Sequence, residues 1–224
     1  MGARLGLPVA GLASGFISST ATIAAMGACA AKAKEVLAAA VAGAVLSTIA
    51  TIIQMALVLA ITSMTTSLSL AIPLTIAGMA AFACGAAFTV LALRRTTDVE
   101  LQGGRAFSLW TTLVFAVTLS IILVACAALQ VRFGENGIIF AAAIVGLADT
   151  HSAAISVASL VASGKLTAAD ALLPILAGLS TNTMSKIVLA TTSGGRSFAV
   201  RVVPGLILVA LAAWAGALYG QAAG

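Results

Sequence analysis

The stretch Gly146-Leu147-Ala148-Asp149-Thr150-His151 lies inside a long apolar segment, and the rest of the sequence is interpreted around it. Asp149 is the acidic residue placed deepest in an apolar run, and two residues later comes the only histidine of the chain. An ionisable side chain at membrane depth is costly, so its presence indicates a functional site. We therefore ask which parts of the chain could surround it.

The composition is that of an integral membrane protein. Of the 224 residues, 62% are hydrophobic and 8% are charged, whereas a soluble domain is about 25% charged. The apolar runs are continuous and do not alternate, which favours helices over a barrel. The basic residues are scattered at helix ends, so they favour lipid headgroups over nucleic acid as a partner. We expect a multi-pass protein of the inner (cytoplasmic) membrane.

The hydropathy pattern predicts an all-α, polytopic fold with about seven transmembrane helices in a single membrane domain, 1–224. Each apolar segment exceeds the roughly 20 residues that a crossing helix needs. The predicted spans are 5–31, 36–61, 68–93, 107–131, 137–163, 168–191 and 198–221.

The connection between the fifth and sixth spans carries the clearest turn signals. Gly164 can end the fifth helix in a left-handed conformation, and Thr167 and Asp170 have the spacing of a capping box. The two helices should therefore form a tight hairpin.

An internal repeat is the next feature of the sequence. The segment 15–20 aligns with 146–151 at an offset of 131 residues, 46–48 aligns with 179–181 at 133, and Pro73 falls opposite Pro204. We interpret residues 5–93 as repeat one, 107–131 as a linker helix and 137–221 as repeat two. Because four spans separate the first helix from the fifth, the repeats should be parallel, with a site near the membrane midplane between them.

The same count of crossings assigns basic residues to the two sides of the membrane. The larger group favours a cytoplasmic face opposite the N-terminus. On the N-terminal side are Arg4, Arg132, Arg196 and Arg201, and on the other Lys32, Lys34, Arg94, Arg95, Arg105 and Lys165.

Depth along the predicted hairpin suggests partners for Asp149. Asp149 and Asn182 lie equally far from the turn, so both should lie near the midplane. Lys186 is one helical turn beyond Asn182 and shares its face. A pair between Asp149 and Lys186 would lower the cost of burying both charges.

His151 fits this site only if the helix is interrupted. In a continuous helix it points about 200° away from Asp149. Either it meets a different helix, as a hydrogen-bonded residue without chemistry, or the segment unwinds around 146–150 and the two side chains converge. Serines at 152, 156, 159 and 163 extend a polar stripe from Asp149, which favours a polar cavity, although small residues also serve helix packing.

Repeat one offers hydroxyl and amide groups for the other half of such a cavity. They are Ser18, Ser19, Thr20 and Thr22 in the first span, and Ser47, Thr51 and Gln54 on one face of the second. These groups suit a cation or the polar groups of a small solute. Isolated serine and threonine hydroxyls, however, often bond back to their own helix.

These motifs, 18–22, 148–151 and 180–183 together with Lys186, resemble those of a family of bacterial membrane proteins of unknown function. It is catalogued as domain of unknown function four thousand and ten and is often fused to an MgtC/SapB-type membrane domain. The resemblance covers nearly the whole chain, although this chain begins almost directly at the first motif. It implies a membrane protein and no mechanism.

The sequence therefore predicts a transporter or channel-like carrier for a small ion or polar solute, with proton coupling as one form of this function. Asp149 would bind a cation or proton, His151 would relay it, Lys186 would neutralise Asp149 in the empty state, and Asn182 with the repeat-one hydroxyls would coordinate. The alternative is a non-transporting regulatory or assembly subunit in which Asp149 and Lys186 form a structural ion pair. We expect no enzyme, cofactor or metal site, because there is one histidine and no nucleophile-base constellation. Both a monomer and a homo-oligomer agree with the sequence.

Overall fold

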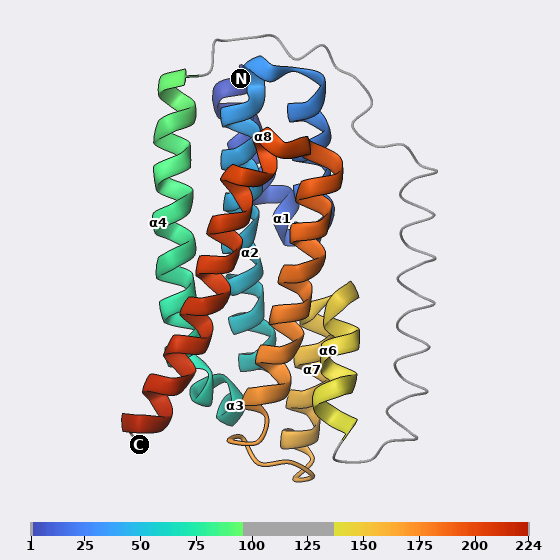
Figure 1. The fold of residues 1–224 in the computed structure, drawn as a ribbon. Helices are drawn as coiled ribbons and strands as arrows, with labels where there is room; N and C mark the ends of the chain where they lie inside the picture. Colours follow the sequence, from blue (N-terminus) through green and yellow to red (C-terminus); the bar gives the residue numbers. More distant parts are fainter. Residues whose placement is uncertain (1, 96–136, 224) are drawn as a thin grey trace. The chain divides into compact units, whose positions relative to one another are not determined.

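A computed structural model describes residues 2–95 and 137–223, and none of these residues lies in a strand (Figure 1). The all-α prediction is thus confirmed for the described part of the chain, and the predicted linker helix at 107–131 lies outside it. In chain order the helices are α1 (Ala3–Lys32), the 3-10 turn η1 (Lys34–Val36), α2 (Leu37–Thr62), α3 (Met64–Ser69), α4 (Ala71–Arg95), α6 (Ile138–Ala148), α7 (Thr150–Ala162) and α8 (Leu172–Ala223).

The helices have the length and composition of membrane-spanning segments. Within the described residues, four stretches are long and apolar enough to cross a membrane by length and composition alone, namely 3–32, 34–62, 71–94 and 172–222, and α6 and α7 are shorter apolar helices. Large apolar side chains such as Ile17, Ile61 and Phe140 are 74% to 90% exposed, which suits contact with lipid. The chain is a membrane protein.

The chain divides into two compact units. Among the described residues, unit 1 comprises 2–56, 71–95 and 183–223, and unit 2 comprises 57–70 and 137–182. Within each unit, side-chain contacts show the direction in which neighbouring helices run.

In unit 1, helix α1 turns back on itself at Ser18, whose backbone is extended (φ −162°, ψ 106°). Before Ser18, Gly11 packs against Gly43 and Gly15 against Ser47, so this half runs parallel to α2. After Ser18 the order reverses, because Ser19 is bonded to Thr51 while Met26 again contacts Gly43.

The hydroxyls of Ser14 and Thr22 confirm this reversal. They lie 2.9 Å apart, although eight residues of straight helix would separate them by about 12 Å. Helix α1 is therefore a helical hairpin whose halves of about 15 residues are too short to cross the membrane. The predicted crossing span at 5–31 is wrong in this respect.

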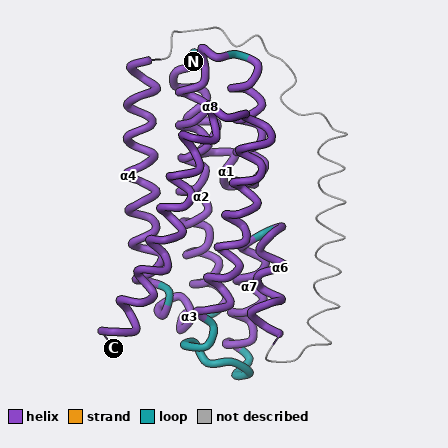
Figure 2. The backbone as a smooth tube through the Cα atoms, in the orientation of Figure 1, coloured by secondary structure: helices purple, strands orange, loops and turns teal. Residues whose placement is uncertain are grey.

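Unit 2 contains a second hairpin, formed by α6 and α7 (Figure 2). Asp149 between them is extended (φ −154°, ψ 115°). A Cβ on Gly178 would lie about 3 Å from both the Ala142 carbonyl oxygen and the Ala153 side chain, which a straight helix would hold about 16 Å apart. The predicted crossing span at 137–163 is corrected accordingly.

Helix α8 is divided at Gly195, where the chain turns sharply (Figure 1). Gly195 has φ 65° and ψ −179°, a backbone conformation open essentially to glycine alone. The division falls between the two predicted spans 168–191 and 198–221.

The directions of the helices in unit 1 overturn the predicted parallel repeats. Lys186 contacts Thr51, whereas Ser193, further along α8, lies against Gly27 at the Met26 end of the α1 hairpin, the end near the start of α2. The segment 183–194 therefore runs antiparallel to α2. The prediction takes the segment 137–163 as one crossing of the membrane. Because this segment turns back, the helices after it run in the direction opposite to the predicted one.

The next pair of helices in unit 1 is also antiparallel. Gly205 lies against Cys84 and Gly216 against Pro73, so the segment 196–223 runs antiparallel to α4. Both pairs of helices that the sequence placed in matching positions of the two repeats are thus antiparallel in unit 1.

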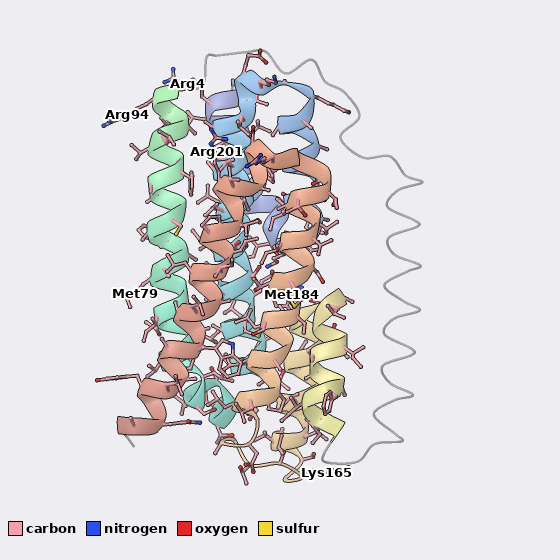
Figure 3. The ribbon with its side chains drawn as sticks, viewed as in Figure 1. Arg4, Met79, Arg94, Lys165, Met184 and Arg201 are labelled. Atoms are coloured by element: carbon pink, nitrogen blue, oxygen red, sulfur yellow. The ribbon has the colours of Figure 1, made fainter. Side chains whose placement is uncertain are left out.

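Basic side chains gather at one end of unit 1. The Arg4 guanidinium donates a hydrogen bond to the Leu93 carbonyl, so the start of α1 and the end of α4 lie together, and Figure 3 shows Arg4, Arg94 and Arg201 toward the same end. The predicted assignment of Arg4 and Arg94 to opposite sides is wrong because α1 does not cross. The same end carries Lys32 and Lys34 before α2, and Arg196 after Gly195.

The connection between α7 and α8 in unit 2 follows the turn signals. Gly164 has φ 71°, its N–H bonds to the Val161 carbonyl, and the Lys165 N–H bonds to the Leu160 carbonyl, which is a Schellman ending. The Thr167 hydroxyl accepts from the Asp170 N–H at 3.1 Å. The predicted caps are confirmed, although α8 itself begins at Leu172.

The hairpin α1 requires glycine where it touches α2. An alanine Cβ at Gly11 would overlap the Gly43 backbone, whereas at Gly78 it would lie 3.5 Å from Ile52. We expect Gly11→Ala to lower the free energy of unfolding by about 1–3 kcal/mol through overpacking. Gly78→Ala should raise it by about 0.5–1 kcal/mol, because alanine favours the helix. Denaturant unfolding in detergent measures both, and equal effects would contradict the packing.

Candidate functional site

The hairpin tip of unit 2 is held by the Asp149 carboxylate. One oxygen, Oδ1, lies 3.1 Å from the His151 backbone nitrogen and 3.0 Å from its Nδ1. The other, Oδ2, accepts from the Ser152 N–H at 3.0 Å and its hydroxyl at 2.6 Å. An ionised carboxylate offers about four lone-pair sites, so local donors fill the acceptor capacity of Asp149.

This arrangement determines which ring nitrogen of His151 carries a proton. Because Asp149 Oδ1 is an acceptor, Nδ1 of His151 carries a proton, and a second proton would go to Nε2. The two side chains converge because the helix is interrupted, so the predicted interruption around 146–150 is confirmed. Their side chains are 20% (His151) and 33% (Asp149) exposed.

The helix break also removes the Ala148 carbonyl from the helical ladder. In a continuous helix, the Ser152 N–H would bond to that carbonyl, but here it bonds to Asp149. The N-terminus of α7 supports the negative charge of its cap. The tip therefore combines an ionised cap, a histidine and a carbonyl released from the helical ladder.

Close packing places this tip against α8. A Cβ on Gly146 would lie 2.6 Å from the Thr181 hydroxyl, and that hydroxyl donates to the Ala143 carbonyl at 2.6 Å. Asn182, the next residue, is 3% exposed and lies near the middle of the helical segment 172–194. The predicted depth of Asn182 near the midplane fits this position.

The hairpin tip of unit 1 is capped in the same way by a neutral residue. The Ser18 hydroxyl accepts from the Ala21 N–H at 3.2 Å, and the Thr22 hydroxyl donates to the Ser18 carbonyl at 2.8 Å. Ser19, Thr20 and Thr22 are all buried. Because Gly15 and Ser19 lie against residues 47 and 51 at the middle of α2, this tip lies halfway along a membrane-length helix.

Lys186 is joined to this tip through hydroxyl groups. Its side chain is 2% exposed and is the largest fully buried side chain in the described part of the chain. The Nζ donates to the Thr51 hydroxyl at 3.0 Å, which donates in turn to the Ser19 hydroxyl at 2.8 Å. A buried ammonium group thus stands beside the break of α1.

The other predicted residues of α2 have different roles. Gln54 donates to the Phe16 carbonyl at 2.7 Å and so satisfies a backbone group near the break. The Ser47 hydroxyl bonds back to the Ala44 carbonyl at 2.7 Å, and Ser47 serves as the surface on which Gly15 packs.

The remaining predictions for the site have mixed outcomes. Asp149 belongs to unit 2 and Lys186 to unit 1, so their pairing stays a prediction. In the serine stripe, Ser159 and Ser163 are exposed and bond back to their own helix. Among the residues that the structure describes, no group of three or more His, Cys, Asp or Glu side chains could hold a metal ion.

Sequence reasoning missed Thr150, the first residue of α7. It is 2% exposed, and its buried hydroxyl has no hydrogen-bond partner in the described part of the chain. The signal was available, because the 131-residue offset places Thr150 opposite Ser19 and Asn182 opposite Thr51. The contacts of Gly15 with Ser47 and of Gly146 with Gly178 keep that same offset.

Comparison with known proteins identifies a family. A family model described as a domain of unknown function, DUF4010, matches residues 1–194. The match includes both hairpins and ends just before Gly195. Curated proteins and solved structures give no match.

The hydroxyl of Thr51 should be needed for the stability of the buried ammonium. We expect Thr51→Val to lower the free energy of unfolding by about 1–3 kcal/mol, because Lys186 and Ser19 each lose a partner. Lys186→Met in the same background should recover part of that loss. Thr75→Val is the matched control, since that exposed hydroxyl bonds only to the Ala71 carbonyl. If the effects of the two substitutions on the free energy of unfolding were additive, the interaction between Thr51 and Lys186 would be contradicted.

Proposed function

The chain belongs to the DUF4010 family of unknown function, and from its two helical hairpins we propose that it is a membrane transporter or channel-like carrier for a small ion or polar solute. We further propose a multi-pass protein of the inner membrane. Its orientation would place the end of unit 1 that carries Arg4, Lys32 and Arg94 in the cytoplasm, in keeping with the positive-inside rule.

The observation that carries this proposal is the pair of capped hairpin tips. Breaks in the helical ladder are tolerated in lipid only where they are buried in protein or face a water-filled cavity. Ser18 and Asp149 each stand at such a break in an apolar helix, and polar side chains surround both. Discontinuous helices of this kind hold the ion and substrate sites of many secondary transporters.

We also propose that the transporter is built from two inverted repeats. Each would consist of a hairpin followed by two long helices, with repeat one at 3–95 and repeat two at 138–223. Three observations support this proposal. The breaks at Ser18 and Asp149 have nearly the same backbone angles, the glycine contacts share one offset, and the corresponding helices run antiparallel in unit 1. Inverted repeats are one of the known ways in which transporters are built.

In the proposed mechanism His151 exchanges the proton and Asp149 orients it. The bond from Nδ1–H to Asp149 fixes the tautomer, so the proton is gained and lost at Nε2. A doubly protonated His151 and ionised Asp149 form an ion pair, which strengthens the cap of α7. Loading the proton would therefore stiffen this tip. Asn182 is the proposed contact of the solute in unit 2, and the hydroxyls of Ser19, Thr20 and Thr22 are those proposed for unit 1.

A second candidate function is a regulatory or assembly subunit that transports nothing. It is favoured by one observation, the filled acceptor capacity of the Asp149 carboxylate, which suits a purely structural cap. In that case Asp149 would act only as the structural cap of α7, and a variant that keeps the cap, such as Asp149→Asn, should preserve assembly. The ion pair with Lys186 stays a prediction from the sequence.

Substitution of Asp149 separates these functions. Asparagine caps helices about as well as aspartate, whereas alanine costs about 1–2 kcal/mol at such a position. We expect Asp149→Asn to keep the unfolding temperature near that of the parent but to lower proton-coupled flux in proteoliposomes by roughly 10²-fold or more, the scale of a lost general acid-base partner. Asp149→Ala should lose both stability and flux.

The matched control is Asp170→Asn, another carboxylate at a helix start, which lies in the exposed loop before α8. It should transport like the parent. If every solute that moves is transported equally by the parent and by Asp149→Asn, the role of the Asp149–His151 pair is refuted.

A further inference from the structure

We infer that the tip of the α6–α7 hairpin binds one small monovalent cation, with the Thr150 hydroxyl and the Asn182 side-chain carbonyl as ligands. The inference rests on the proposed transport function, which it deepens by naming the coupling ion or cargo as a monovalent cation. It is argued entirely from residues of unit 2, with unit 1 as an internal reference.

The first observation is the orphaned hydroxyl of Thr150. A hydroxyl group with no hydrogen-bond partner is costly inside a protein, and each such group calls for an explanation. Thr150 is 2% exposed and its Oγ1 is fully buried without a partner among the described residues. A ligand beside Oγ1 would remove that cost.

The second observation is what the equivalent hydroxyl does in α1. Ser19 occupies the same position after its break as Thr150, and its hydroxyl accepts from Thr51. Thr51 in turn accepts from the Lys186 ammonium at 3.0 Å. Beside that break, therefore, a positive charge is bonded to the hydroxyl network and is tethered to the chain.

The residues that correspond in repeat two lack such a tether. By the 131-residue offset, Asn182 stands where Thr51 stands. Unit 2 thus presents a hydroxyl and a side-chain carbonyl, and its helical segments 138–148, 150–162 and 172–182 contain no lysine or arginine. A free cation would supply the charge that Lys186 supplies in unit 1.

The surroundings of Thr150 suit a positive ion. The carbonyls of Gly146 and Ala148 are released from the helical ladder at the end of α6, which is also the negative end of its dipole. Asp149 adds a negative charge one residue away, although its oxygens are already bonded to His151 and Ser152. Neutral oxygens and one engaged carboxylate favour a monovalent over a divalent cation, which requires more carboxylate ligands.

Cation-dependent stability tests the site without requiring transport. The full chain, purified in detergent with choline as the only cation, is titrated with sodium or potassium chloride at constant ionic strength. Because a ligand of the folded state raises its stability, we expect a saturable rise of the unfolding temperature by several degrees with one of the two ions. Thr150→Val should abolish that rise, and in choline it should be as stable as the parent or more so, because it removes an orphaned hydroxyl.

Thr48→Val is the matched control. Its hydroxyl is also buried without a partner among the described residues, but Thr48 belongs to α2 of unit 1, so this variant should keep the full response to the cation. The absence of any response in the parent, or its persistence in Thr150→Val, would overturn the site and point to a bound water in its place.

Direct binding covers the case in which Thr150→Val does not fold. Equilibrium binding of radioactive sodium or rubidium to the parent should saturate near one ion per chain, and its absence refutes the site. The outcome is separable from transport. Cation binding without flux of any solute would leave the site and refute the carrier, whereas flux that is indifferent to both cations would leave the carrier and refute the site.

Discussion

Everything in this protein depends on how two interrupted helices satisfy their backbone away from water. An apolar medium offers no partners for free N–H and C=O groups, so a chain can reverse direction there only if side chains take their place. The Ser18 hydroxyl and both oxygens of Asp149 do this for the amides, and Gln54 does it for the Phe16 carbonyl. These few hydrogen bonds make re-entrant hairpins possible where continuous helices would otherwise form.

The capped breaks also fix where the polar groups lie. Glycines at 11, 15 and 146 let the hairpin halves touch neighbouring backbones, and this contact sets the depth of each tip. Because Gly15 and Ser19 meet the middle of α2, the unit 1 tip lies far from either end of that helix. The packing of small residues therefore also sets the position of the polar groups.

The sequence predicted most of the described helices but not the directions in which they run. Hydropathy located nearly every described helix, and the turn signals around Gly164 and Thr167 predicted real caps. It could not distinguish a crossing helix from a hairpin, because about 27 apolar residues suit either one. The repeat was also aligned by residue identity alone, which matched Ser47 with Ser180, whereas the packing of the two hairpins matches Ser47 with Gly178.

The two tips differ in chemistry although they share a backbone. In α1 the cap is a neutral serine and the nearby charge is the ammonium of Lys186, held by a hydroxyl chain. In the α6–α7 hairpin the cap is an ionised aspartate with a histidine beside it, and the hydroxyl equivalent to Ser19 has no partner in the described part of the chain. A charge fixed by a covalent tether cannot be exchanged, whereas a proton on His151 or an ion beside Thr150 can. Under the proposed transport function, the exchangeable charge therefore belongs to the second hairpin, whereas the charge beside the first is fixed.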